Sequence, residues 1–149
     1  MTNVETGYEI RMKGEKVLME RCLPCTESIP TVLSDELKVL MAEKNGCGLS
    51  ANQVGINKRF FIAKIDGKIC VFHNPFILSH GKSEVETPEG CLSILDEFGA
   101  FIYKPKSRWE VIDVEYRDKD FKLIRTTLKR REARIFQHEL DHLEGRFCQ

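Results

Sequence analysis

The segment from Leu128 to Leu143 constrains the fold most, because its apolar residues recur with the period of a helix that is buried over much of its surface. At about 100° per residue, the apolar stripe consists of Ala133, Phe136, Leu140 and Leu143. The arc that we expect to face solvent consists of Arg130, Arg134, Gln137, Asp141 and Glu144. His138 and His142 lie about 40° apart on a third sector beside Ile135, so both imidazoles point the same way from consecutive turns. The sequence therefore predicts a largely buried helix that carries two histidines into the interior.

One pair of strands is predicted near the middle of the chain. Strand-like stretches span Arg59–Ile65 and Lys68–Phe72. The dipeptide between them, Asp66-Gly67, is typical of a tight hairpin turn. Asn74-Pro75 follows the second stretch, and we expect it to end that strand.

A second pair of strands and a further helix are predicted on either side of this hairpin. Apolar and polar residues alternate around Trp109–Tyr116, and Phe121–Leu128 is the expected partner strand. Upstream, Ser34 is the expected N-cap of a helix that ends at Asn45-Gly46. A loop with three glycines is expected to follow over Gly46–Gly55.

These elements indicate an α+β fold, in which small antiparallel β-sheets pack around the buried C-terminal helix. We find no internal repeat and no linker, so we expect one domain over residues 1–149. The 23 basic and 23 acidic side chains cancel, which argues against a protein that binds DNA or lipid through bulk charge. No uninterrupted apolar run is long enough to span a membrane, and the N-terminus shows no secretory signal. We therefore expect a cytoplasmic protein with reduced thiols.

The chemistry of the predicted helix lies in the motif H-E-x-x-H, formed by His138, Glu139 and His142. The two imidazoles can bind one metal ion, and the carboxylate can reach a water on that ion; a catalytic site also needs a third protein ligand. Cys148 would supply it in a metalloprotease pattern, but the sequence ends one residue later and we expect no room for the Met-turn of such enzymes. A noncatalytic zinc module would instead use the C-x-x-C pair Cys22 and Cys25, across a gap of 112 residues where zinc fingers have about a dozen. The remaining upstream candidates are several carboxylates together with Cys47, Cys70, Cys91, His73 and His80.

Three motifs along the chain resemble those of the peptide deformylase family. They are the glycine-rich segment Gly46–Gln53, the segment Glu89-Gly90-Cys91-Leu92-Ser93 and the segment Gln137–Gly145. The family pattern is a glycine-rich loop that ends in Gln, then E-G-C-L-S, then Q-H-E-x-D-H-L-x-G. Order and approximate spacing also match, so the resemblance covers most of the chain.

The resemblance implies a site for one divalent metal ion. Cys91, His138 and His142 would hold the ion, with water in the fourth position. Ferrous iron is the metal expected from the family, and Zn²⁺, Ni²⁺ or Co²⁺ can occupy a site with thiolate and imidazole ligands. Glu139 would accept the proton of the water and then deliver it to the departing amine.

The resemblance also implies how the substrate is held. The side-chain amide of Gln53 and the backbone N–H of Leu92 would stabilise the oxyanion that forms on attack. The backbone of Gly48 would pair with the substrate peptide as an added strand would, and Ile135 would line the pocket for a methionine side chain. The implied reaction is the hydrolysis of N-formyl-methionyl peptides to formate and a free N-terminal methionine.

The cellular setting follows from that reaction. Formylated starts belong to bacterial-type translation, so the resemblance implies the cytoplasm of a bacterium or of a bacteriophage-infected cell. The basic stretch Lys122–Arg134 could contact the ribosome transiently, although a solvated helix and strand face is the interpretation that we favour. We expect the protein to act as a monomer.

Overall fold

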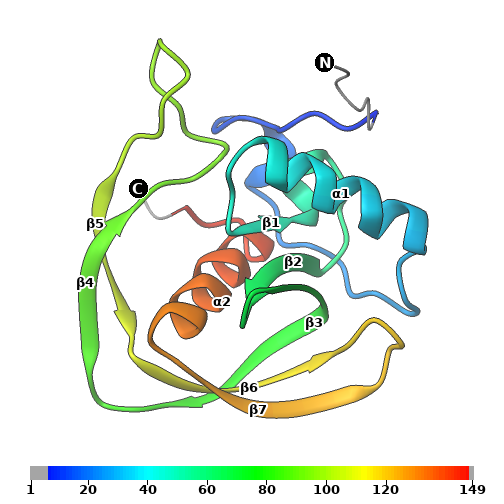
Figure 1. Ribbon diagram of the computed structural model, residues 1–149, viewed down its shortest axis with the longest axis vertical. Helices are drawn as coiled ribbons and strands as arrows, with labels where there is room; N and C mark the ends of the chain where they lie inside the picture. The colour runs from blue at the N-terminus through cyan, green and yellow to red at the C-terminus, as the bar shows by residue number, and fades with distance from the viewer. Residues whose placement is uncertain (1–6, 148–149) are drawn as a thin grey trace.

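Helix α2 (Arg130–Leu143) lies at the centre of the fold, with strands on several sides of it (Figure 1). The computed structural model describes residues 7–147. Within them the strands are β1 (Gly48–Ser50), β2 (Phe60–Ile65), β3 (Lys68–His80), β4 (Glu84–Glu89), β5 (Lys104–Trp109), β6 (Val111–Arg117) and β7 (Leu123–Lys129). The other helical elements are α1 (Thr31–Glu43) and the 3₁₀ turns η1 (Lys16–Leu18) and η2 (Ala51–Val54).

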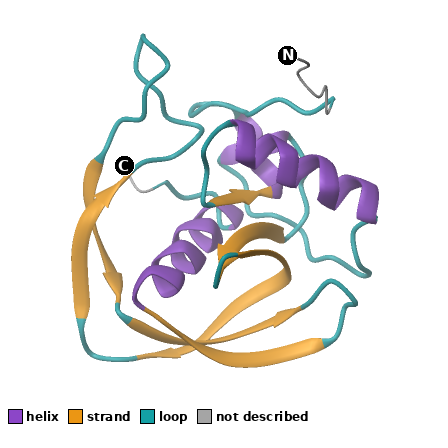
Figure 2. Ribbon diagram, in the orientation of Figure 1, coloured by secondary structure: helices purple, strands orange, loops and turns teal. Residues whose placement is uncertain are grey.

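The strands form two antiparallel sheets. Five of them follow the order β1-β2-β3-β6-β7, and β4 pairs with β5 in a separate two-stranded ribbon. In Figure 2 this ribbon runs along one side of α2, while β1, β2 and β3 lie on the other side. The expected α+β fold, with small antiparallel sheets around the C-terminal helix, is therefore confirmed. No helix formed by the described residues is long and apolar enough to cross a membrane.

Strand β2 separates two parts of the core, which explains its uninterrupted apolar sequence. Because successive side chains of a strand point to opposite faces, Phe60 and Ile62 pack in one cluster, with residues of α1. Phe61 and Ala63 pack in the other cluster, which includes Phe136 of α2. All four β2 residues are completely buried. A strand covered on both faces can be apolar at every position. Here one of these faces packs against α2.

The predicted hairpin between β2 and β3 is confirmed, but the predicted end of the second strand is wrong. Ile65 pairs with Lys68, and both turn residues have positive φ, 51° at Asp66 and 74° at Gly67. Strand β3 continues through Asn74-Pro75 to His80, with a register shift relative to β6 after His73. This β-bulge leaves the proline, which has no N–H to donate, outside regular pairing.

Two predictions near the N-terminal half also need correction. Helix α1 begins at Thr31, because Pro30 occupies the cap position, whereas Ser34 lies inside the helix and its N–H donates to the Pro30 carbonyl. The end of this helix before Asn45-Gly46 is confirmed. The segment expected to be a loop, Gly46–Gly55, contains the edge strand β1 and the turn η2.

The predicted solvent-facing arc of α2 is wrong in its middle, which the β4–β5 ribbon covers, whereas Arg130 at its start is exposed as expected. Gln137 is only 5% exposed and bonds both backbone groups of Trp109, at 2.9 Å to the N–H and 2.8 Å to the carbonyl. Arg134 and Asp141, from the same arc, make ion pairs with residues of the ribbon. The predicted apolar stripe, by contrast, does pack in the core.

Candidate metal centre

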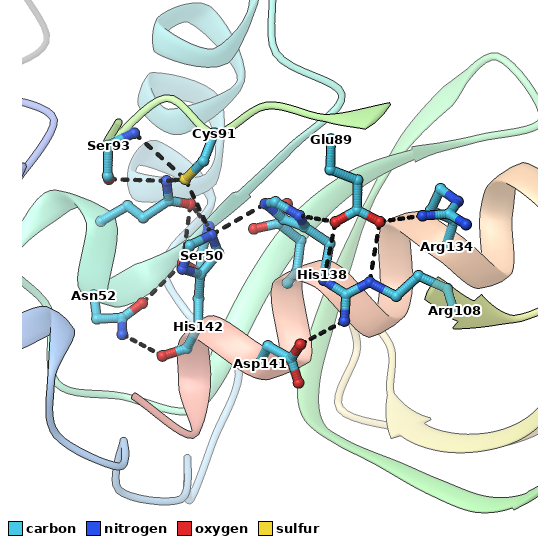
Figure 3. Close-up of polar contacts among 12 residues, drawn as sticks. Ser50, Asn52, Glu89, Cys91, Ser93, Arg108, Arg134, His138, Asp141 and His142 are labelled. Carbon is cyan, nitrogen blue, oxygen red and sulfur yellow. Dashed lines mark hydrogen bonds and ion pairs between the residues drawn. The ribbon is translucent and has the colours of Figure 1, made fainter. Parts of the chain in front are cut away.

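Three possible metal ligands from two distant segments meet beside α2. Cys91 follows the end of β4, and His138 and His142 lie on consecutive turns of the helix (Figure 3). Their ligand atoms all lie within 4.8 Å of one another. The two Nε2 atoms are 3.1 Å apart, and the Sγ of Cys91 is 3.2 Å from Nε2 of His142. Within residues 7–147, this is the one group of three or more such side chains that could hold a metal ion.

The second ring nitrogen of His138 fixes its orientation. Nδ1 donates to Oε1 of Glu89 at 2.9 Å, so Nε2 is left facing Cys91. Glu89 also accepts two hydrogen bonds from Arg108, at 2.9 and 3.0 Å, and one from Arg134. Arg108 in turn pairs with Asp141. The buried carboxylate therefore connects α2 to the β4–β5 ribbon and aims the imidazole at the site.

Burial and close contacts shift the pKa values of three side chains in this cluster. Burial opposes ionisation of Glu89, but the hydrogen bonds from His138 and Arg108 lower its pKa to about 2. Burial also opposes a charge on His138, while its contacts with Cys91 and Glu89 raise its pKa well above the usual value. Burial lowers the pKa of His142 well below its usual value, so this imidazole is held neutral. A thiol and two imidazole nitrogens that converge in this way are a donor set that suits zinc or iron.

Replacing Glu89 by glutamine should therefore weaken metal binding. An amide accepts less strongly from Nδ1 of His138 and leaves two buried guanidinium groups short of their counter-charge. We expect about a 10- to 100-fold loss of metal affinity, measured by competition with a chelator. Glu86→Gln, on an exposed position of the same strand, is the matched control and should bind as the native chain does. Unchanged affinity in Glu89→Gln would show that this carboxylate does not orient the ligand.

The turn η2 places Gln53 against the same cysteine. Its Oε1 accepts from the backbone N–H of Ser50 at 3.0 Å, in a capping box that fixes the side chain. Its Nε2 then lies 3.5 Å from Sγ of Cys91 and donates to Ser93 at 3.1 Å. The neighbouring Asn52 donates to the carbonyl of His142 at 2.6 Å, which ties this turn to α2. An amide donor is thus held beside the metal ligands by backbone geometry.

Glu139 lies beside the ligands but is not one of them. Its side chain is almost completely buried, and its Oε2 is 4.0 Å from Nε2 of His138. Its Oε1 has no hydrogen-bond partner among the described residues. Burial is the main cause that raises the pKa of this carboxyl to about 7. A buried carboxyl with a free oxygen next to a metal site is suited to proton transfer.

Strand β1 must carry a glycine at position 48 because Glu139 packs directly against its backbone. A Cβ atom there would lie 2.6 Å from Oε2 and 2.9 Å from Cγ and Cδ of Glu139. The carbonyl of the preceding residue, Cys47, accepts from the N–H of Lys64 on β2. Since backbone groups alternate in direction along a strand, the N–H and carbonyl of Gly48 point to the open edge of the sheet.

Gly48→Ala should accordingly displace the Glu139 carboxylate without removing a metal ligand. Because a misplacement of about 1 Å can cost about 10²-fold in rate, we expect kcat to fall by roughly that factor at unchanged metal content. Gly81→Ala is the control, since a Cβ atom there would make only ordinary contacts at 3.7–3.8 Å. Full activity of Gly48→Ala would mean that the position of Glu139 does not matter for turnover.

A cavity of about 250 Å³ opens beside these residues. Its walls include all but one of the site residues predicted from the sequence, namely Gly48, Gln53, Cys91, Leu92, Ile135, His138 and Glu139. The remaining one, His142, is buried behind Cys91. The sequence did not predict the roles of Arg108 and Asp141, which support Glu89, or of the cavity residues Tyr103 and Arg131. Arg108 offers no local signal, because only the folded ribbon brings it to the helix, and Asp141, on the helix itself, was expected to face solvent.

The other candidate ligands are not part of this group. Cys22 and Cys25 are buried in two different core clusters, and Cys148 lies outside the described residues. His73 is fully buried with both ring nitrogens bonded, Nε2 to the N–H of Ile29 and Nδ1 to backbone carbonyls. His80 stacks on Trp109 at a ring-centroid distance of 3.7 Å.

Comparison with known proteins agrees with this geometry. The family model described as polypeptide deformylase matches residues 8–149. The peptide deformylase of Thermotoga maritima is 34% identical over 142 residues, which cover 93% of this chain and 82% of that protein.

Solved structures show the same fold. A peptide deformylase from Synechococcus elongatus, in complex with actinonin, superposes with a TM-score of 0.87 at 27% identity, over 99% of this chain and 80% of that one. A class I type b peptide deformylase from Acinetobacter baumannii, with Met-Ala-Ser bound, superposes with a TM-score of 0.85 at 29% identity, over 95% of each chain. The similarity thus extends over nearly the whole chain in sequence and in structure.

Proposed function

From the premise that the chain belongs to the peptide deformylase family, we propose which of its residues carry out the reaction and under what conditions. The activity is that of the family: hydrolysis of the formyl group from the N-terminus of nascent peptides, with release of formate. Our proposal for the role of each residue rests on one observation. Cys91, His138 and His142 converge beside the buried Glu139.

The three converging residues would hold one divalent metal ion. The donor set fits it, because a thiol and two imidazole nitrogens converge and His138 is oriented through its outer nitrogen. A metal ion in such a site lowers the pKa of a coordinated water from 15.7 towards about 7, which supplies a nucleophile at neutral pH. We expect ferrous iron in the cell, with Zn²⁺, Ni²⁺ or Co²⁺ as alternatives.

Glu139 moves the proton in this proposal. Its unpartnered Oε1 is positioned to accept a proton from the attacking water as the water adds to the formyl carbon. The same oxygen then delivers the proton to the amine nitrogen as the C–N bond breaks. Gly48 leaves room for this carboxylate, since any side chain there would displace it.

Two donors would stabilise the negative charge that develops on the formyl oxygen. The first is Nε2 of Gln53, which the capping box holds beside Cys91. The second is the backbone N–H of Leu92, for which no acceptor is found among the described residues. Removing one such donor typically costs about 10²- to 10³-fold in rate.

The substrate peptide would lie along the open edge of β1. The N–H and carbonyl of Gly48 are free to pair with its backbone, as in other cases of strand addition. Ile135, one turn before His138 on α2, lines the cavity where the methionine side chain would sit. The bound Met-Ala-Ser of the Acinetobacter baumannii structure is a ligand of this chemical type.

The setting of the reaction remains part of the proposal. Formylated starts place the enzyme in the cytoplasm of a bacterium or of a bacteriophage-infected cell, acting as one domain over residues 1–149 and as a monomer. A solvated face remains the interpretation that we favour for the stretch Lys122–Arg134, and a transient contact with the ribosome, the alternative, would use the exposed basic residues of β7 in it. Co-sedimentation with ribosomes at low and high salt would test that contact, because a charge-driven association weakens as salt rises.

The direct test of function is formate release. Protein loaded with ferrous iron under anaerobic conditions should release one formate for each formyl-Met-Ala-Ser cleaved and should leave acetyl-Met-Ala-Ser intact. Metal-stripped protein should be inactive until metal is restored. Absence of formate from the iron-, zinc-, nickel- and cobalt-loaded protein would overturn the proposal.

A further inference from the structure

A cation without a counter-ion borders the substrate cavity. Arg131 lies on α2 and lines the cavity together with Ile135 and His138. Among the described residues, its one side-chain hydrogen bond runs from Nη2 to Sγ of Cys47, is 3.2 Å long and is exposed to solvent. Sulfur is a weak acceptor. Within residues 7–147, no carboxylate lies within ion-pair distance of this guanidinium.

The second arginine of the cavity differs in this respect. Arg134 pairs with Glu89 and also donates to the backbone carbonyls of Lys106 and Val85. Its donors are therefore committed to fixing the β4–β5 ribbon on α2. Arg131 is the cavity arginine that remains available to a ligand.

The spacing of residues along α2 relates Arg131 to a particular part of the substrate. His138, Ile135 and Arg131 lie on one helix face, because residues separated by three, four or seven positions fall on the same side. Arg131 is about 6 Å from Ile135 along the helix axis, at 1.5 Å per residue. In an extended peptide, side chains two residues apart share a face and are separated by about 6.6 Å. A peptide whose first side chain packs on Ile135, and which runs along α2 away from the metal ligands, would present its third side chain at Arg131.

We propose that Arg131 is a specificity-determining residue that selects formylated peptides with a carboxylate at the third residue. This inference rests on the proposed function, because it takes the methionine position at Ile135 as its starting point. The guanidinium would exchange its weak contact with Cys47 for a charge-assisted hydrogen bond to an Asp or Glu side chain. The contact lies away from the reacting atoms and strengthens binding equally in the ground and transition states, so it lowers KM and leaves kcat unchanged.

The test compares three amidated peptides that differ only at the third residue: formyl-Met-Ala-Glu-Ala, formyl-Met-Ala-Gln-Ala and formyl-Met-Ala-Lys-Ala. The C-terminal amide removes the peptide's terminal carboxylate, which could also bind Arg131. Comparing kcat/KM for formyl-Met-Ala-Ser as the free acid and as the amide measures the effect of that terminal carboxylate separately. We expect kcat/KM to fall in the order Glu, Gln, Lys, with about a 1.5- to 5-fold difference between Glu and Gln at low salt. The difference should arise in KM and shrink at about 1 M salt, where the Debye length is about 3 Å.

Variants test whether Arg131 is the side chain that causes the preference for Glu at the third residue. Arg131→Gln should remove the difference between the Glu and Gln peptides, and Arg131→Glu should favour the Lys peptide. Arg130→Gln is the matched control, because it removes the same charge from the next, exposed residue, which does not line the cavity. This control should keep the native order of substrates.

The outcomes separate this inference from the function on which it rests. Two results would overturn the role of Arg131: equal kcat/KM for the Glu and Gln peptides in the native chain, or a preference for Glu that survives in Arg131→Gln. In either case, formate release would still support the proposed function. If none of the three peptides released formate, both the role of Arg131 and the proposed function would be overturned. Calorimetry with the deformylated product Met-Ala-Glu-Ala-amide checks the contact without turnover. The native chain should bind this product more tightly than its Gln counterpart, and Arg131→Gln should bind the two products with equal affinity.

Discussion

Glu139→Gln is expected to lower kcat/KM for a formyl-methionyl peptide by about 10²- to 10⁴-fold, the usual contribution of a positioned general acid–base. Glutamine keeps the size of the side chain, so the close packing against Gly48 is preserved. It cannot accept the proton of the attacking water or return it to the amine. Metal content should stay at the native level, because the three ligands are untouched.

Two measurements support this interpretation of the variant. Metal analysis must show the same metal content as the native chain, so that the loss of rate is not a loss of the ion. Glu132→Gln, on the first turn of the same helix and outside the cavity, should keep the native rate. Turnover of Glu139→Gln within a few fold of the native value would remove this residue from the mechanism.

Cys91→Ser is expected to lose most of its bound metal and, with it, the activity. The substitution removes one of three ligands, and serine is a poor substitute because its hydroxyl is not ionised at neutral pH. The loss of metal affinity should exceed the roughly 10- to 100-fold effect typical of an outer hydrogen-bond partner, such as we expect for Glu89→Gln. Purification without oxygen followed by metal analysis measures it.

Other cysteine variants test the rival ligand sets in the same experiment. Cys148→Ser should keep its metal, whereas a metalloprotease that used this residue as third ligand would lose it. A Cys22→Ser/Cys25→Ser variant should also keep its metal, unlike a zinc module built on that pair. Circular dichroism confirms that each variant is folded. Full metal occupancy of Cys91→Ser would refute the proposed ligand set.

Helical periodicity was sufficient to predict two of the three metal ligands. The positions of His138 and His142 relative to Ile135 follow from the geometry of a single helix. The structure confirms that Ile135 and His138 line the cavity and that Nε2 of His142 lies 3.1 Å from Nε2 of His138. The strand pairs around Asp66-Gly67 and after Trp109 were also predictable, because turn residues and alternation are local signals.

The remaining ligand could not be predicted from local patterns. Cys91 lies far from His138 in the sequence, and the glycine beside it is only a weak local signal of a metal ligand, which Cys47 shares. The family motif around Cys91 was needed to indicate its role. The supporting contacts of Glu89 were missed for the same physical reason, because Arg108 reaches it only through the pairing of β4 with β5.

The wrong predictions have a common cause in tertiary packing. The polarity of Gln137 indicated solvent, yet the ribbon covers this side chain and satisfies its amide with the backbone of Trp109. Asn74-Pro75 indicated the end of a strand, yet a bulge accommodates it, and Asn74 exchanges hydrogen bonds of 2.8 and 2.9 Å with the backbone of Cys25. Local propensity cannot anticipate partners that come from distant parts of the chain.

X-ray absorption at the zinc edge of zinc-loaded Cys148→Ser protein tests the central claim most directly, because it reports the atoms bound to the metal. We predict one sulfur at about 2.3 Å and two imidazole nitrogens at about 2.0–2.1 Å. When Cys91 is also replaced by serine, little zinc should stay bound, and the zinc that does should show no sulfur ligand. A first shell without sulfur in the Cys148→Ser protein, or a sulfur that persists after Cys91 is replaced, would contradict the account.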